Sequence, residues 1–164
     1  MISNTNNKNE QVAMTKRERL NVENQARLAC SRAFSCRAES KKLVVGTKGP
    51  VHEFDIFFEG VVIGGVSTST YKTSRGSPNT GSRDRACAEL LWLSLWPGQE
   101  SRVHVLTDKP LADWLFKRFD NAPFLINIDI YYYDVARDAL AFVGSVGAGS
   151  FCVEEYLSDD LIPA

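Results

Sequence analysis

The sequence predicts an α/β domain in which helices flank a mixed central β-sheet in a three-layer-like arrangement. Three observations predict this fold class. The 164 residues are 44% hydrophobic, which is sufficient for one core. Two β-rich segments on either side of Glu59-Gly60 have the spacing of a hairpin. The segments that follow alternate between helical and strand-like patterns, without an internal repeat or a sign of a second domain.

The first predicted element is a helix over residues 15–40. Thr15 and Glu18 have the spacing of a capping box, and an apolar stripe at helical spacing runs from Val22 to Cys36. Residues 1–14 are rich in Asn, Ser and Lys and are expected to form a disordered tail, so the predicted domain spans residues 15–164. Four arginines on the other faces of the helix fit either a solvated surface or a phosphate-contacting one: Arg19, Arg27, Arg32 and Arg37.

A hairpin is expected next, over residues 51–67, with strands at 51–58 and 61–67. Alternation along its first strand places Phe54 and Ile56 on one face and Asp55 on the other, beside Glu53. Residues 67–82 are mostly Ser, Thr, Gly, Pro and Asn, and so form a polar loop. A loop of that length in a compact domain is usually functional or disordered.

The second half of the chain supplies two more helices and further strands. A largely buried helix with Ser82 as its cap is expected at 83–95, a strand at 102–107, a helix capped by Asp108 at 109–119 and a strand at 125–133. Residues 135–143 are expected to continue the sheet edge and residues 144–150 to be a flexible connector. The C-terminal end is acidic.

Composition excludes several classes of protein. There is no apolar run of the length that a membrane span requires and no hydrophobic signal core at the N-terminus, so the sequence predicts a soluble, cytoplasmic protein with no membrane partner. The four cysteines (Cys30, Cys36, Cys87 and Cys152) form no CxxC pair, which favours reduced thiols over a disulfide or a zinc site. His52 and His104 lie in strand-like segments, where a structural role is expected.

The net charge of −1 does not exclude nucleic acid. Residues 1–50 carry ten Lys or Arg against four Asp or Glu, whereas residues 100–164 carry five against eleven. The near-neutral total is therefore a cancellation between the two ends of the chain, which permits a basic surface.

The hairpin and its surroundings resemble a known superfamily. The segments HEFDI (52–56) and VIGGVS (62–67), followed by the polar loop and a leucine-rich helix, resemble the core of the PD-(D/E)XK, restriction-endonuclease-like superfamily. The resemblance covers about residues 20–133. It implies a restriction-endonuclease-like core, with the order helix, hairpin, helix, strand, helix, strand. It also implies Mg²⁺-dependent hydrolysis of phosphodiester bonds in DNA, commonly by a homodimer.

The catalytic signature of that superfamily is incomplete in this chain. The family has an Asp, an acid on the next strand and a Lys two residues beyond the acid. Asp55 matches the Asp, but the positions of the acid and the Lys fall on Gly65 and Ser67. Neither residue can bind a cation or supply a positive charge.

Three interpretations of the missing groups stay open. Other residues could replace them, with Asp55, Glu53 and Lys72 as the catalytic set and Glu39 as a further metal ligand; Glu89 on the second helix is another acid of this kind. The chain could instead be a nuclease fold that has lost catalysis and binds DNA or a protein partner within a larger assembly. Finally, it could be an altered version of an active enzyme.

The polar loop and the start of the next helix are the candidate nucleic-acid surface. Arg75, Asn79, Arg83 and Arg85 offer donors for phosphate groups, and the last two lie near a helix N-terminus, where backbone N–H groups also favour anions. The alternative is a mobile polar loop without a ligand.

Overall fold

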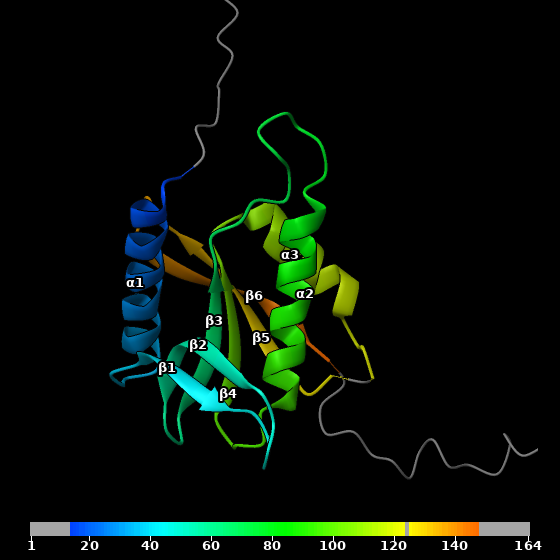
Figure 1. The fold of residues 1–164 in the computed structure, drawn as a ribbon. Coiled ribbons are helices and arrows are strands. Elements are labelled where there is room, and N and C mark those ends of the chain that lie inside the picture. The colour runs from blue at the N-terminus through cyan, green and yellow to red at the C-terminus, as the bar shows by residue number, and fades with distance from the viewer. Residues whose placement is uncertain (1–13, 124, 148–164) are drawn as a thin grey trace, which may run out of the picture.

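The computed structural model of the chain describes residues 14–123 and 125–147. Its elements, in chain order, are α1 (Lys16–Ala33), β1 (Glu39–Val44), β2 (Val51–Phe58), β3 (Val62–Ser67), α2 (Thr80–Leu95), β4 (Ser101–Leu106), α3 (Lys109–Phe119), β5 (Ile128–Asp134) and β6 (Ala139–Val146). The strands form one six-stranded sheet in the order β1-β2-β3-β4-β5-β6, flanked by the three helices (Figure 1). The predicted tail, apart from Met14, and the acidic C-terminal end lie outside the described residues.

The sheet is mixed, as predicted. Strands β1, β2 and β3 pair antiparallel, and the turn at Glu59-Gly60 reverses the chain with Gly60 at φ 74°, a conformation that favours glycine. Strand β3 pairs parallel with β4, and β4 parallel with β5. Parallel neighbours need a long crossover, which α2 and α3 provide. Strand β6 returns antiparallel to β5.

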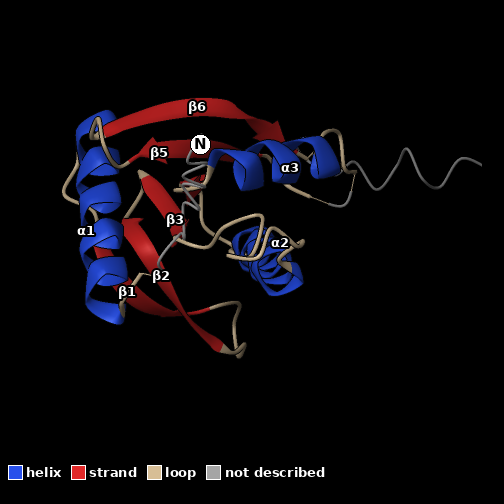
Figure 2. Ribbon diagram, turned by 90° about the horizontal axis from the view of Figure 1, so that it is seen from above, coloured by secondary structure: helices blue, strands red, loops and turns tan. Residues whose placement is uncertain are grey.

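Helices cover both faces of the sheet. In Figure 2, α1 lies on one side, and α2 and α3 lie on the other. Two clusters of buried residues match this arrangement: Ala26, Ala29 and Cys30 of α1 belong to one, and residues of α2 and α3, such as Leu90 and Leu115, belong to the other. The α/β class with helices on both faces of a mixed sheet is thus confirmed.

The prediction that the first helix continues to residue 40 is wrong. The capping box at its start is present, since the Glu18 N–H donates to Thr15 Oγ1 at 3.2 Å and the Thr15 N–H donates to Glu18 Oε2 at 2.6 Å. The helix ends at Ala33, and Ser35 adopts φ 50°. Residues 39–44 then pair with β2, and this tertiary pairing overrides the local helical pattern.

The predicted alternation along the first hairpin strand is also wrong. Phe54 lies in the cluster beneath α2 and α3, whereas Ile56 lies in the cluster beneath α1, so the two residues face opposite sides. The pairing with β1 explains this. Lys41 pairs with Phe54 and Glu39 pairs with Phe57, which leaves one extra residue in β2. Such a bulge shifts the side-chain alternation by one position.

Several element boundaries differ from the prediction. Helix α2 starts at Thr80 with Asn79, not Ser82, as its N-cap. Strand β5 starts at Ile128 rather than 125, and β6 includes Gly144, which was expected to lie in a connector. A side chain at Gly144 would overlap the ring of Phe116, so glycine is required for this strand to pass α3. The Asp108 cap of α3 is as predicted.

Two further expectations concern cysteines and membranes. Among the described residues, Cys30, Cys36 and Cys87 are free thiols, and Cys152 lies outside the described residues. Within residues 14–123 and 125–147, no helix is both long and apolar enough to cross a membrane.

Candidate active site

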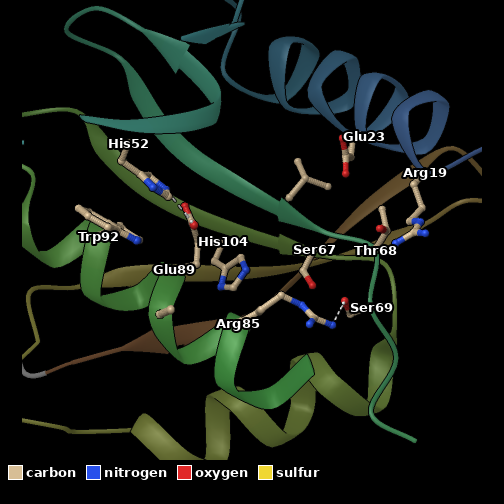
Figure 3. Close-up of a pocket in the computed structure, with 12 residues that line it drawn as sticks. Arg19, Glu23, His52, Ser67, Thr68, Ser69, Arg85, Glu89, Trp92 and His104 are labelled. Carbon is tan, nitrogen blue, oxygen red and sulfur yellow. Dashed lines mark hydrogen bonds and ion pairs between the residues drawn. The ribbon is translucent and has the colours of Figure 1, made fainter. Parts of the chain in front are cut away.

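A cleft of about 400 Å³ lies at the carboxyl end of β3 (Figure 3). Helices α1 and α2 contribute to it from opposite faces of the sheet, and β2 and β4 each contribute one histidine. The side chains labelled there are Arg19, Glu23, His52, Ser67, Thr68, Ser69, Arg85, Glu89, Trp92 and His104. The cleft therefore combines carboxylates, histidines, arginines and hydroxyl groups.

The two helices present matching pairs of charges to this cleft. Arg19 and Glu23 lie four residues apart on α1, and Arg85 and Glu89 lie four residues apart on α2, so each pair shares one helix face. Among the described residues, neither Arg19 nor Arg85 has an ion-pair partner within 4 Å. The Arg85 guanidinium instead donates to the Ser69 hydroxyl at 3.2 Å. Both guanidinium groups thus remain able to bind an anion.

Glu89 occupies the space beside Gly65. A methyl group added at Gly65 would overlap the carboxyl group of Glu89. One carboxyl oxygen, Oε2, lies 3.2 Å from Nε2 of His52, while the other, Oε1, is buried and has no hydrogen-bond partner in the structure. An acid from α2 therefore occupies the space beside Gly65, the strand position at which the resemblance expects an acid.

Asp55 is half-buried on β2, and its Oδ2 accepts a hydrogen bond of 2.8 Å from the Val66 N–H. Burial is the main cause that raises the pKa of Asp55 from 3.8 to about 6. The Val66 bond opposes this rise, and the negative charges of Glu23 and Glu89 add to it. Asp55 is therefore a half-buried carboxyl group on which two neighbouring carboxylates act, a pattern that is common at functional sites.

Two other groups at the cleft are perturbed by burial. Burial raises the pKa of Glu23, against the opposing charges of Arg27 and Arg19. His104 is fully buried beside Gly65 in the parallel pairing of β3 with β4, and burial lowers its pKa to about 4 despite the nearby charge of Glu89. His104 is therefore neutral at pH 7, and its Nδ1 has no hydrogen-bond partner in the structure.

Glu53, Glu39 and Asp55 are not among the residues that line the cleft, although Asp55 reaches its edge through the bond to Val66. Glu53 is exposed and accepts a hydrogen bond from the Ser40 hydroxyl at 3.2 Å. Glu39 is exposed on β1, not at a helix end, and lines a separate hollow with Arg27. The carboxylates that act on Asp55 come from the two helices instead.

Lys72 and Arg75 are exposed in the loop between β3 and α2, and neither residue lines the cleft. The backbone of Lys72 forms an isolated antiparallel bridge with Pro78, which folds the loop back on itself. Ser67, the position at which the resemblance expects a lysine, lines the cleft at the end of β3.

The other predicted phosphate ligands separate into two groups. Arg85 lines both the cleft and an adjoining hollow of about 490 Å³, which also contains hydroxyls of the loop. Asn79 borders that hollow, but its side-chain oxygen caps α2 by accepting the Ser82 N–H. The Arg83 guanidinium lies over the rings of Tyr71 and Trp114, 4.2 and 5.2 Å from their centroids, and so packs the loop onto α3.

Sequence reasoning did not place Glu23 in the site. It named Arg19 only as one of four arginines on a solvated or phosphate-contacting helix face, and it expected structural roles for His52 and His104. The repeated Arg-to-Glu spacing of four residues on two helices was the available signal.

The donor set suits a hard cation only in part. Among the described residues, no group of three or more His, Cys, Asp or Glu side chains is arranged to hold a metal ion. Asp55 and the unpartnered oxygen of Glu89 still offer two carboxylate ligands. Mg²⁺ commonly takes only one or two carboxylates from the protein, with water and substrate phosphate completing its shell.

Comparison of the chain with protein-family models, with curated proteins and with solved structures found no match.

Proposed function

We propose that this protein hydrolyses phosphodiester bonds in DNA with Mg²⁺, using a restriction-endonuclease-like core in which Glu89 replaces the missing acid of β3. The observation that carries the proposal is the Glu89 carboxyl group beside Gly65, where its charge acts on Asp55. The order of elements supports it as well: a helix, three antiparallel strands, a crossover helix and a strand parallel to the third.

Asp55 and Glu89 would hold the cation. The unpartnered, buried Oε1 of Glu89 supports this assignment, because a buried carboxylate oxygen without a donor is costly unless a ligand completes it. When bound, Mg²⁺ would polarise a phosphoryl oxygen and lower the pKa of a bound water. The raised pKa of Asp55 fits the same role, since a cation favours the charged carboxylate that burial disfavours.

The arginines would supply the positive charge that Ser67 cannot. Arg85 lies beside Ser69, two residues beyond Ser67, and Arg19 lines the same cleft from the opposite helix. A guanidinium binds phosphate through a planar fork of donors and stays charged at any working pH. The hydroxyls of Thr68 and Ser69 add neutral donors for the same phosphate backbone.

Plasmid cleavage tests the proposal directly. The wild-type chain should nick or linearise plasmid with Mg²⁺ or Mn²⁺, and Glu89→Gln and Asp55→Asn should each lower the rate by about 100-fold or more. Glu53→Gln is the matched control, because Glu53 is exposed and outside the cleft, and it should cleave at the wild-type rate. A folded wild-type chain that cleaves no DNA with either metal would sink the enzymatic proposal, as would full activity of Glu89→Gln.

The second candidate is a catalytically inactive nuclease fold that binds DNA or a protein partner. The observation that favours it is Ser67 at the position of the family's lysine. In that case the chain would bind DNA with an affinity that falls steeply with salt, and would cleave none. Replacing both Arg19 and Arg85 with Ala should then weaken binding and reduce the salt slope. No DNA binding at low salt would leave only the protein partner.

A homodimer is proposed with the nuclease function, because cutting both strands of a duplex commonly uses two subunits. Sedimentation of the full chain, with and without duplex DNA, tests this. A monomer in both states would remove the dimer from the proposal.

A further inference from the structure

His52 joins strand β2 to helix α2 beside the proposed cation site (Figure 3). Its Nε2 lies 3.2 Å from Oε2 of Glu89. Its ring is stacked on Trp92, with centroids 4.5 Å apart and planes at 10°, and meets the ring of Phe54 edge-on at 4.7 Å and 81°. The imidazole is therefore fixed by two aromatic contacts and one polar contact.

The Glu89 carboxyl group has little else to fix it. Its side chain comes from a helix and has several rotatable bonds, whose ordering costs side-chain entropy. Gly65 offers space but no donor, and Oε1 has no partner. The charge of Glu89 acts on the pKa of His104, but the two side chains make no hydrogen bond with each other in the structure. The bond from His52 is the one directional contact to this carboxyl group among the described residues.

Glu89 and Trp92 are three residues apart on α2, so one helical turn carries both the carboxylate and the ring on which His52 stacks. A carboxylate that accepts from Nε2 also fixes the tautomer of His52, with the proton on Nε2. The contact thus sets which oxygen of Glu89 is occupied and which is free.

We propose that His52 is a positioning residue that holds Oε2 of Glu89 and thereby leaves Oε1 beside Gly65 as a ligand for the divalent cation. This inference rests on the proposed function. It follows the general behaviour of metal-binding carboxylates, whose second oxygen or neighbours are fixed by hydrogen bonds, and loss of such a partner typically costs about 10–100-fold in metal affinity.

Two variants separate the hydrogen bond from the ring packing. His52→Phe keeps an aromatic ring on Trp92 but removes the donor, whereas His52→Gln keeps a side-chain N–H donor and removes the ring. Mn²⁺ binding to the full chain, measured by calorimetry or by the electron paramagnetic resonance signal of free Mn²⁺, is the readout. His52→Phe should bind Mn²⁺ about tenfold or more weakly, and His52→Gln should stay within about threefold of wild type.

Thermal unfolding of both variants, without metal, verifies that each is folded. Wild-type Mn²⁺ affinity in His52→Phe would overturn the inference, and so would equal losses in the two variants, which would assign the effect to packing. If plasmid cleavage persists in wild type while His52→Phe binds Mn²⁺ normally, only the role of His52 fails. A wild-type chain that neither binds Mn²⁺ nor cleaves DNA would overturn the proposed function together with this inference.

Discussion

Asp55→Asn should stabilise the fold while it abolishes the proposed activity. Burial raises the pKa of Asp55 from 3.8 to about 6, so the native chain retains a proton that the unfolded chain has already released between these two pH values. The free energy of unfolding therefore falls as pH rises through this window. Asparagine has the same shape, carries no charge and can still accept the Val66 N–H through its side-chain oxygen.

The expected gain follows from the size of the shift. A pKa difference of about two units, at 1.36 kcal/mol each, corresponds to a gain of about 3 kcal/mol at pH 8. At pH 4 the gain is only about 0.5 kcal/mol, because Asp55 is then protonated in the folded chain and about half protonated in the unfolded chain. For a chain of this size, 3 kcal/mol raises the unfolding midpoint by roughly 6–12 °C.

Urea unfolding of wild type and Asp55→Asn, with chelator present, at pH 8 and pH 4 measures this difference. The two proteins must be compared with each other at each pH, because His104 changes the free energy of unfolding with pH in the direction opposite to Asp55. Its pKa is lowered to about 4, so its contribution to stability is lost as pH falls from 6.5 towards 4. Glu53→Gln should change stability at neither pH, since that carboxylate is exposed. Equal gains for Asp55→Asn at both pH values, or none at pH 8, would refute the reasoning.

Three other substitutions test separate parts of the structure. Gly65→Ala should weaken Mn²⁺ binding by about tenfold, because its methyl group displaces the Glu89 carboxyl group; unchanged affinity in calorimetry would contradict the described packing. Arg83→Leu should lower the free energy of unfolding in urea by about 1 kcal/mol through loss of its two aromatic contacts, and a neutral result would show that they contribute nothing. Arg102→Met should cost about 3 kcal/mol in the same assay, since the guanidinium donates to three carbonyl groups at the end of α2; a loss below about 1 kcal/mol would argue against this role.

Local signals in the sequence were sufficient for the parts of the fold that depend on neighbouring residues. The capping box at Thr15, the turn at Gly60 and the cap at Asp108 each involve residues within four positions of one another. The end of α1 and the bulge in β2 depend instead on how β1 pairs with β2, and no local sequence pattern predicts this pairing. The helical spacing up to Cys36 therefore predicted a longer helix than the sheet permits.

In the candidate site, too, local sequence signals predict less than tertiary packing determines. Asp55 and Ser67 were singled out by the family resemblance, whereas the alternation predicted along the first hairpin strand is wrong. Glu23 and Glu89 reach the site only because two helices pack on opposite faces of one sheet, and Arg83, although suitably charged, is held over Tyr71 and Trp114. Residue type and spacing predict a kind of chemistry, whereas tertiary packing decides which acids lie near one another.

The shared space between Gly65 and Glu89 also constrains how this protein can evolve. A single mutation that returns an acid to position 65 meets the carboxyl group already there, and a single loss of Glu89 leaves both positions without an acid. Under the proposed function we expect sign epistasis between the two positions, in which each single step is harmful and only the paired exchange is tolerated. A descendant lineage would keep glycine on the strand for as long as the helix keeps its glutamate.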